Sequence, residues 1–196
     1  MRRPDPLRWL SASLLGALLW LPGLSVAHAD DPEGSIAQLE RRLELARHSR
    51  LLGVQTAPGA ALTPFTTDGC SGGLSAGWDL LAERFPKLAE VHGDEPPWEG
   101  CCVTHDRAYH AGAPRDATPA ASYAARLMAD QALQACVVEV AAARAETLAS
   151  SYGVSAAQVK AAYDWIALLM LRAVRLGGGP CSGLPWRWGY GWPDCR

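Results

Sequence analysis

The sequence has no excess of positive charge. Its 18 basic residues face 20 acidic ones, which gives a formal net charge of −2. Proteins that bind nucleic acids neutralise phosphates with basic patches, so this balance argues against nucleic acid as a partner. It argues equally against attachment to anionic membranes by charge alone.

The sequence also lacks the alternating pattern of β-strands, internal repeats and low-complexity stretches. Apolar residues recur instead at helical spacing, which predicts an all-α fold. We expect helices at about 34–50, 99–110, 120–150 and 155–175, with another between Trp78 and Leu88 that bends or ends near Pro86. Leu39 and Leu43 mark the apolar side of the first helix. The expected inward side of the last one is Val159, Ala162, Tyr163, Ile166, Leu169, Met170 and Ala173.

One long apolar run is present, Trp9–Val26, and arginines precede it. Ala27-His28-Ala29 follows, and this order predicts a signal peptide over residues 1–29 that is cleaved after Ala29. An uncleaved membrane anchor is the alternative, disfavoured because serines, a proline and a glycine interrupt the run. The later run Ile166–Val174 is too short to span a bilayer. We therefore expect a secreted or periplasmic domain over 30–196, not transmembrane after cleavage, with a net charge of −4 once three arginines and one aspartate are removed.

Six cysteines is an even number, and in an oxidising compartment they should pair. No Cys-x-x-Cys pair is present, which disfavours a zinc site at Cys101, Cys102 and His105. Adjacent cysteines cannot bond each other without strain, so Cys101 and Cys102 should have different partners. Six cysteines allow 15 pairings, and their number alone does not choose among them.

The stretch Glu99–His110 reads EGCCVTHDRAYH. On a helix, Cys101 and His105 share a face, whereas Asp106 is turned about 100° away and can serve another partner. A helix tied at two cysteines that presents a histidine and a carboxylate on different faces suits catalysis. A glycine- and proline-rich loop at 55–77 precedes it and contains Asp68-Gly69-Cys70-Ser71-Gly72-Gly73, which by itself is also compatible with a plain turn.

Three segments resemble secreted phospholipases A2. The stretch Cys101-Cys102-Val-Thr-His105-Asp106-Arg-Ala-Tyr109 resembles the active-site helix of that family, Cys-Cys-x-x-His-Asp-x-Cys-Tyr. The loop 68–73 resembles its glycine-rich calcium loop. The segment 129–136 is similar to its second aspartate segment, Cys-Asp-x-x-x-x-x-Cys. Two family cysteines are replaced by Ala108 and Ala129, and because these two bond each other in the family, their joint absence is self-consistent.

The resemblance implies the pairs Cys70–Cys102 and Cys101–Cys136, which leaves Cys181–Cys195. It also implies two antiparallel active-site helices in a single domain, with core motifs at 65–137 and a C-terminal helix and Trp-rich tail at 155–196. If the helices are joined at Cys101–Cys136, a rise of about 1.5 Å per residue places His105 and Asp130 within about 3 Å of the same level. A hydrogen bond between them is then feasible.

The family's activity is Ca²⁺-dependent release of the sn-2 fatty acid from phospholipids at a membrane or micelle surface, leaving a lysophospholipid. The resemblance makes His105 the general base, oriented by Asp130, with Tyr109 and Tyr123 as hydrogen-bond donors to Asp130. Ca²⁺ would be held by the Asp106 carboxylate and by the carbonyls of Gly69, Ser71 and Gly73. Asp68 could add a second carboxylate.

A catalytically silent relative that binds Ca²⁺ and a lipid or a protein is the second hypothesis. The presence of His105, Asp106 and Asp130 together favours the enzyme. A structural helical protein with coincidental motifs is the third. His48, His92, His110 and Asp164 have no such context and are expected at the surface. The aromatic tail residues, Trp186, Trp188, Tyr190 and Trp192, could either lie at a lipid interface or pack within the fold.

Overall fold

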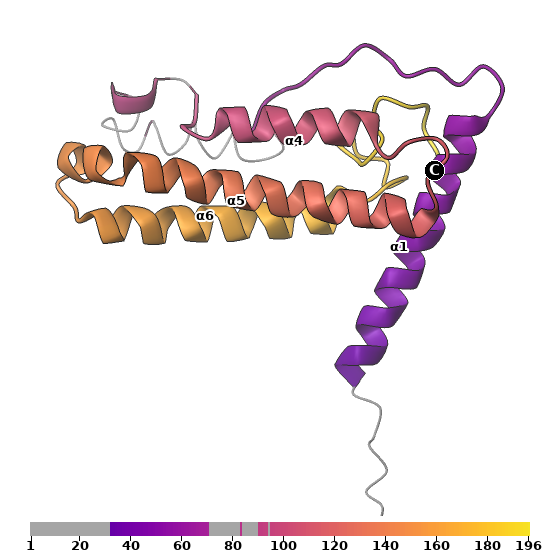
Figure 1. Ribbon diagram of the computed structural model, residues 1–196, viewed down its shortest axis with the longest axis horizontal. Coiled ribbons are helices and arrows are strands. Elements are labelled where there is room, and N and C mark those ends of the chain that lie inside the picture. Colours follow the sequence, from indigo (N-terminus) through magenta and orange to yellow (C-terminus); the bar gives the residue numbers. More distant parts are fainter. Residues whose placement is uncertain (1–31, 71–82, 84–89, 94) are drawn as a thin grey trace, which may run out of the picture.

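The computed structural model describes residues 32–70, 83, 90–93 and 95–196 (Figure 1). Its long helices are α1 (Pro32–Thr56), α4 (Glu99–Ala111), α5 (Pro119–Tyr152) and α6 (Ala156–Gly177). No strand occurs in this part of the chain, so the prediction of a helical fold is confirmed there. The expected signal peptide, Ser71, Gly73 and the helix expected near Trp78–Leu88 lie outside the described residues.

Helices α5 and α6 form a hairpin whose ends are specified by local sequence. The Thr118 side chain accepts a hydrogen bond from the Ala121 amide, and Pro119 opens α5. Gly153 ends it in the left-handed conformation, with φ of 69°. Ser155 and Gln158 then form a reciprocal capping box that opens α6. The two helices pack side by side along their length (Figure 1).

The main core lies between α5 and α6. Small residues on α5, including Ala141 and Ala145, let α6 approach closely. The buried side of α6 consists of Val159, Tyr163, Ala167 and Met170. The expectation that Ala162, Leu169 and Ala173 face inward is wrong, since all three are exposed. Apolar residues occur on more than one face of α6, so the apolar pattern does not identify the face that meets α5.

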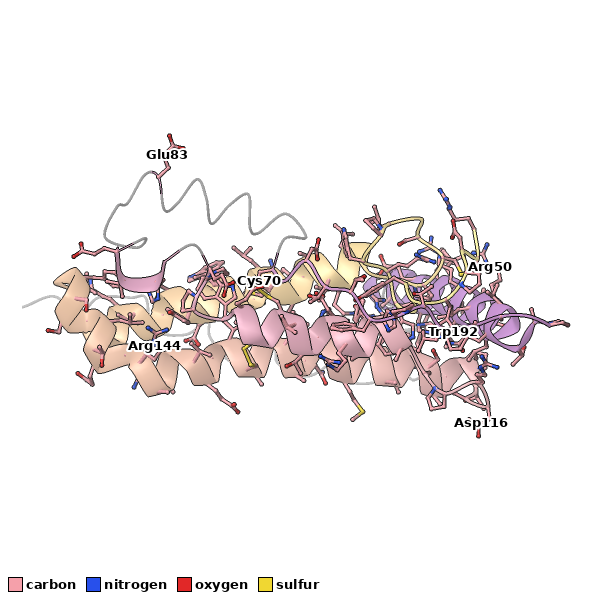
Figure 2. The ribbon with its side chains drawn as sticks, turned by 90° about the horizontal axis from the view of Figure 1, so that it is seen from above. Arg50, Cys70, Glu83, Asp116, Arg144 and Trp192 are labelled. Carbon is pink, nitrogen blue, oxygen red and sulfur yellow. A yellow bond between two sulfur atoms is a disulfide. The ribbon has the colours of Figure 1, made fainter. Side chains whose placement is uncertain are left out.

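Helix α4 runs antiparallel to α5. Three pairs of residues fix this direction: Cys101 bonds Cys136, His105 contacts Asp130, and Tyr109 contacts Arg126. The second disulfide, Cys70–Cys102, holds the segment before residue 71 against α4 (Figure 2). The third is Cys181–Cys195, so the three expected pairs are all present and no cysteine is free.

Helix α1 packs against α5 through its C-terminal half, where His48, Leu51, Leu52 and Gln55 are buried. Its N-terminal half extends away from the other helices (Figure 1). Leu39 and Leu43, on the apolar side expected from the sequence, are therefore 57% and 55% exposed, so this part of the apolar side is not packed against the described residues. The helix also continues to Thr56, beyond the expected end near residue 50.

The C-terminal tail completes α4. The amides of Gly189 and Gly191 donate to the carbonyls of Tyr109 and His110, and the Trp192 indole donates to Ala111. The last carbonyls of a helix have no hydrogen-bond donor within the helix, and here the tail supplies donors for them. Trp188 and Trp192 are buried in a second core with Leu51, Tyr109, Ala113 and the Cys181–Cys195 bridge. Of the two alternatives for the aromatic tail residues, a lipid interface or packing within the fold, the second is therefore correct for Trp188 and Trp192.

None of the helices in the described part of the chain is long and apolar enough to cross a bilayer.

Candidate functional site

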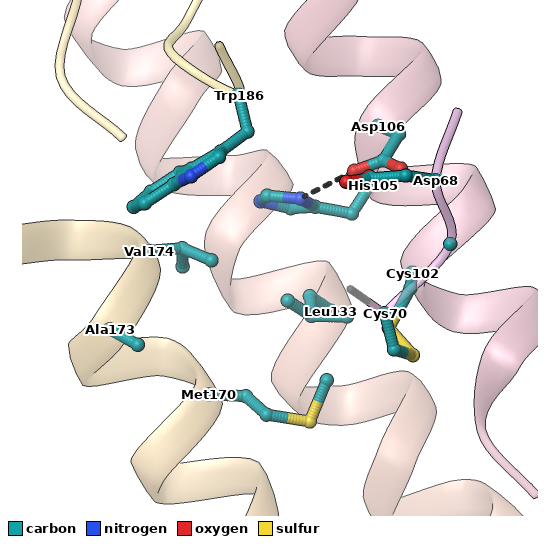
Figure 3. A pocket seen from close by; sticks show the side chains of 11 residues that line it. Asp68, Cys70, Cys102, His105, Asp106, Leu133, Met170, Ala173, Val174 and Trp186 are labelled. Carbon is teal, nitrogen blue, oxygen red and sulfur yellow. Dashed lines mark ion pairs between the residues drawn. A yellow bond between two sulfur atoms is a disulfide. The ribbon is translucent and has the colours of Figure 1, made fainter. Parts of the chain in front are cut away.

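His105 and Asp130 meet between α4 and α5. The ring Nε2 of His105 lies 3.0 Å from Asp130 Oδ1, and the two residues are 8% and 0% exposed. An ionised carboxylate only accepts hydrogen bonds, so Nε2 carries the proton and Nδ1 is left as the basic nitrogen. Nδ1 lies on the side of Asp106, 4.0 Å from Oδ1 of that residue (Figure 3).

Tyr109 supports this pair, as the sequence predicts. Its hydroxyl donates to Asp130 Oδ1 at 2.6 Å, and its ring lies against the His105 ring with centroids 4.1 Å apart. Tyr123 forms no hydrogen bond to Asp130 among the described residues, so the bond expected there is not formed. The Tyr123 ring instead meets His48 edge-on and lies beneath the Arg175 guanidinium.

Arg175 occupies the other side of Asp130. Its Nη1 donates to Asp130 Oδ2 at 3.0 Å, while Arg126 Nε is 3.9 Å from the same oxygen. Nothing in the sequence marks Arg175 as part of a site, because a basic residue in the last turn of a helix is accounted for by the helix dipole. The buried charge of Asp130 is thus compensated by a residue 45 positions away.

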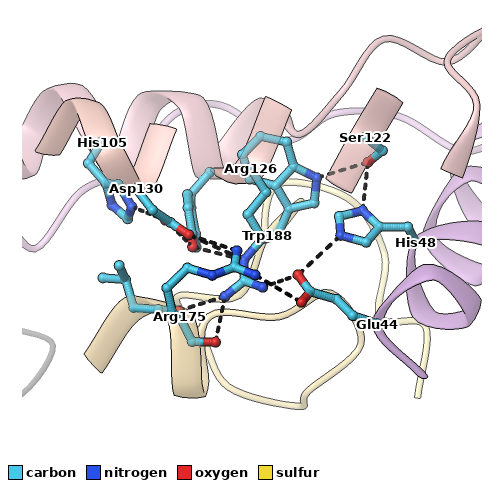
Figure 4. Close-up of polar contacts among 10 residues, drawn as sticks. Glu44, His48, His105, Ser122, Arg126, Asp130, Arg175 and Trp188 are labelled. Atoms are coloured by element: carbon cyan, nitrogen blue, oxygen red, sulfur yellow. Dashed lines mark hydrogen bonds and ion pairs between the residues drawn. The ribbon is translucent and has the colours of Figure 1, made fainter. Parts of the chain in front are cut away.

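A polar network continues from Asp130 to α1 (Figure 4). Arg126, 1% exposed, donates to the Tyr109 hydroxyl and to Glu44, and its Nη2 also donates to the Val174 carbonyl. Glu44 Oε2 accepts from Arg175 Nη2 at 3.0 Å. Burial favours the neutral form of Glu44, but the nearby His48 ring and the charges of Arg126 and Arg175 outweigh it and lower its pKa to about 2.

His48 was expected at the surface, and this is wrong. It is fully buried, with Nδ1 2.8 Å from Ser122 Oγ and Nε2 3.5 Å from Glu44, and burial lowers its pKa. His110 is also buried, edge-on to Phe65. His92 is partly buried next to Tyr152. Asp164 is exposed, as expected.

The pKa of His105 is set by opposing effects. Burial of the ring alone would lower it. The nearby carboxylates of Asp106 and Asp130, of which Asp130 is hydrogen-bonded to the ring, outweigh burial and raise the pKa above its ordinary value. A histidine with a raised pKa is a stronger base and is stabilised once it has taken up a proton.

An open pocket borders the Nδ1 side of His105 (Figure 3). One rim carries Asp68, Gly69 and Asp106. The opposite wall is apolar and combines residues from α5, α6 and the tail: Leu133, Met170, Ala173, Val174 and Trp186. The pocket therefore places a basic nitrogen between an acidic rim and a surface that suits hydrocarbon.

The acidic rim is held by contacts between the loop and α4. Thr67 Oγ1 donates to Asp106 Oδ2 at 2.5 Å, and the Cys70 amide donates to Glu99 Oε2 at 3.3 Å. Gly69 has φ of 68°, and a Cβ there would lie 1.6 Å from Glu99 Oε1, so another residue would strain the backbone and displace the Glu99 carboxylate. This role of Glu99 has no signal in the sequence. Burial and then the charges of Glu95, Asp106 and Asp68 raise its pKa against the lowering effect of the Cys70 bond.

The donors on this rim fit a hard cation. Asp68 and Asp106 offer carboxylate oxygens, which Ca²⁺ prefers, and neither pairs with an arginine or lysine in the described part of the chain. The described residues contain no cluster of three His, Cys, Asp or Glu side chains of the kind that binds a metal by side chains alone. Carbonyl oxygens would have to complete the shell, and Ser71 and Gly73 lie outside the described residues. Zinc at Cys101 and Cys102 is excluded because both sulfurs are in disulfides.

Comparison with known proteins adds no relative: no family model, curated protein or solved structure matches the chain.

Proposed function

We propose that the protein is an exported, Ca²⁺-dependent phospholipase A2 that hydrolyses the sn-2 ester of glycerophospholipids. One observation carries the proposal. His105 is held at Nε2 by the buried carboxylate of Asp130, while Nδ1 faces a pocket with an acidic rim and an apolar wall. The resemblance of the sequences around residues 68–73, 101–109 and 129–136 to this family supports the same assignment.

In the proposed reaction a water molecule lies next to His105 Nδ1. As the water oxygen attacks the ester carbonyl carbon, Nδ1 takes its proton, and Asp130 stabilises the imidazolium that forms. The tetrahedral intermediate then expels the glycerol oxygen, which receives the proton back from Nδ1. The products are a fatty acid and a lysophospholipid, and His105 returns to its starting state.

Asp106, Asp68 and the carbonyls of Gly69, Ser71 and Gly73 would hold Ca²⁺. When bound, Ca²⁺ supplies the positive charge that polarises the ester carbonyl and stabilises its oxyanion. The opposite wall of the pocket, with Leu133, Met170 and Trp186, suits an acyl chain. The substrate would be taken from a membrane or micelle surface.

Export is supported by the three disulfides, which persist in oxidising compartments. N-terminal sequencing of protein released by expressing cells is expected to begin at Asp30. A mature chain that still contains Trp9 would contradict cleavage after Ala29.

The test of the activity uses vesicles of a phospholipid with different acyl chains at sn-1 and sn-2. Purified oxidised protein is incubated with Ca²⁺ or with excess chelator, and the released acids are identified by mass spectrometry. We expect the sn-2 acid with Ca²⁺ only. Release of the sn-1 acid, or equal release with chelator, would contradict the proposal. Ca²⁺-dependent vesicle binding without any release would favour the silent binding protein.

A further inference from the structure

We propose that Arg175 and Glu44 are positioning residues for the His105–Asp130 pair, through which the docking of α1 sets the orientation of the catalytic carboxylate. The inference rests on the proposed function and extends it to residues outside the resembling segments.

The two carboxylate oxygens of Asp130 have different hydrogen-bond donors. Oδ1 receives both His105 Nε2 and the Tyr109 hydroxyl. Oδ2 receives Arg175 Nη1 at 3.0 Å, whereas Arg126 Nε, at 3.9 Å, is too distant for a hydrogen bond. Asp130 is fully buried, so no solvent can replace this donor. Arg175 therefore prevents rotation of the carboxylate and keeps Oδ1 directed at His105.

The Arg175 side chain is itself held by Glu44. Its side chain is 23% exposed and lies at the last turn of α6, where a long side chain has many rotamers. Glu44 Oε2 accepts from its Nη2 at 3.0 Å while Nη1 bonds Asp130. The planar guanidinium thus spans two carboxylates from two helices, and that geometry needs arginine. The low pKa of Glu44 keeps its carboxylate charged at neutral pH.

Glu44 connects the surroundings of Asp130 to helix α1. Glu44 is also bonded to buried Arg126, which donates to the Tyr109 hydroxyl, so both partners of Asp130 outside the His105 ring are linked to Glu44. Glu44 lies on α1 one turn before buried His48, where α1 packs against α5. The orientation of the Asp130 carboxylate is therefore coupled to the packing of α1 against α5 (Figure 4).

The kinetic test compares Arg175→Met, Arg175→Lys and Glu44→Gln with the wild type. Misorientation of a catalytic group can reduce turnover about 100-fold. We expect kcat for Arg175→Met to fall about 10- to 100-fold with KM within about twofold. Arg175→Lys should recover part of this loss, because an ammonium restores the charge but cannot span both carboxylates. The loss in the double variant Glu44→Gln/Arg175→Met should be smaller than the product of the two single losses, because Glu44 acts in part through Arg175.

Matched controls come from the same helices. Arg172 is exposed and lies one turn before Arg175, and Glu40 is exposed and lies one turn before Glu44. Arg172→Met and Glu40→Gln should leave kcat and KM unchanged. A folded Arg175→Met variant with wild-type kcat would overturn the proposal, and so would additive losses in the double variant. If Arg175→Met does not fold, Arg175→Lys decides, since full wild-type kcat would also overturn it.

A second readout does not depend on hydrolysis. The Nε2 proton of His105, hydrogen-bonded and buried, should give a proton NMR signal downfield of the amides that disappears in His105→Gln. We expect this signal to shift or to exchange faster with water in Arg175→Met and to be unchanged in Arg172→Met. An unchanged signal in Arg175→Met would overturn the positioning role. If the wild type hydrolyses no phospholipid, the proposed function fails, but this experiment still decides the positioning role.

Discussion

Carboxylates lie on both sides of the His105 ring, but those behind the ring are paired with arginines and those on the pocket side are not, among the described residues. Behind the ring, buried Asp130 and partly buried Glu44 are bridged by Arg126 and Arg175. On the pocket side, Asp68, Glu99 and Asp106 surround the loop, and the described residues show no arginine or lysine paired with any of them. The two sides lie only the width of an imidazole ring apart.

This difference separates two tasks. Carboxylates that are paired and buried are fixed in place, and removing one partner leaves an uncompensated charge. Carboxylates without a cationic partner at an open rim create a negative potential that attracts cations from solution. The rear side can therefore orient a base, whereas the pocket side can receive an ion. The following predictions test this division.

The largest expected effect is on turnover in His105→Gln. General base catalysis typically contributes a factor of about 10² to 10⁴, and the initial hydrolysis rate should fall by that amount. Ca²⁺ affinity and the circular dichroism spectrum should stay as in the wild type, because neither depends on the base. Asp130→Asn should cost less, and the double variant should be little slower than His105→Gln. Near-normal turnover by folded His105→Gln would exclude this mechanism.

The second prediction concerns stability on the rear side. Removing one partner from a buried ion pair costs about 3 kcal/mol or more, and Glu44→Gln should lower the free energy of unfolding by about that amount at pH 7. The folded-state pKa of Glu44 is lowered from 4.5 to about 2, so its contribution is present above pH 4.5 and is lost as the pH falls towards 2.

Urea unfolding at pH 7 and pH 3 measures both effects. The destabilisation caused by Glu44→Gln should be smaller at pH 3 than at pH 7. Glu40→Gln, the exposed control, should change neither value. Equal destabilisation by Glu44→Gln at the two pH values would show that its charge does not hold the network.

The third prediction concerns the pocket side. Asp106→Asn removes a carboxylate ligand and should weaken Ca²⁺ binding at least about 100-fold by isothermal titration calorimetry. Glu44→Gln removes a carboxylate from the rear side and should leave the Ca²⁺ affinity unchanged. If both variants lost Ca²⁺ binding equally, the division between the two sides would be wrong.

The smallest expected effect is that of Asp68→Asn. Asp68 is exposed, so water and salt screen its charge more than that of Asp106. We expect about a tenfold loss of Ca²⁺ affinity at low ionic strength, and a smaller loss in 1 M salt. A loss as large as that of Asp106→Asn, independent of salt, would make Asp68 an equal ligand.

The His105–Asp130 contact could be predicted because the resemblance implied the Cys101–Cys136 pairing, which was then combined with helix spacing. His105 and Asp130 each lie within six residues of a cysteine in the same disulfide, so the covalent link sets their relative level. The rear network was not predictable in this way. Glu44 and Arg175 are 131 residues apart, and their contact depends on how α1 crosses the ends of α5 and α6.

The incorrect and missing predictions likewise concern burial and contacts that depend on how distant segments pack together. Arginine, glutamate and histidine are usually exposed, so Arg126 and His48 carry no sign in the sequence that they are buried. Leu39 and Leu43 follow an apolar helical pattern on a stretch of α1 that does not pack against the other described residues. The close approach of Glu99 to Gly69 depends on the Cys70–Cys102 link and on the turn of the loop, which spacing does not determine.

The tail that caps α4 has a consequence for biosynthesis. Gly189 follows Tyr109 by 80 residues, and its amide is the partner of the Tyr109 carbonyl. The carbonyls of Tyr109 and His110, at the end of the helix that carries His105, therefore cannot acquire these partners until residues 189 and 191 have been synthesised. A product truncated before residue 188 would contain His105, Asp106 and Asp130 but would leave Tyr109 without the covering ring of Trp188. The surroundings of the candidate site are thus complete only when the segment 188–192 has been synthesised and has folded onto α4.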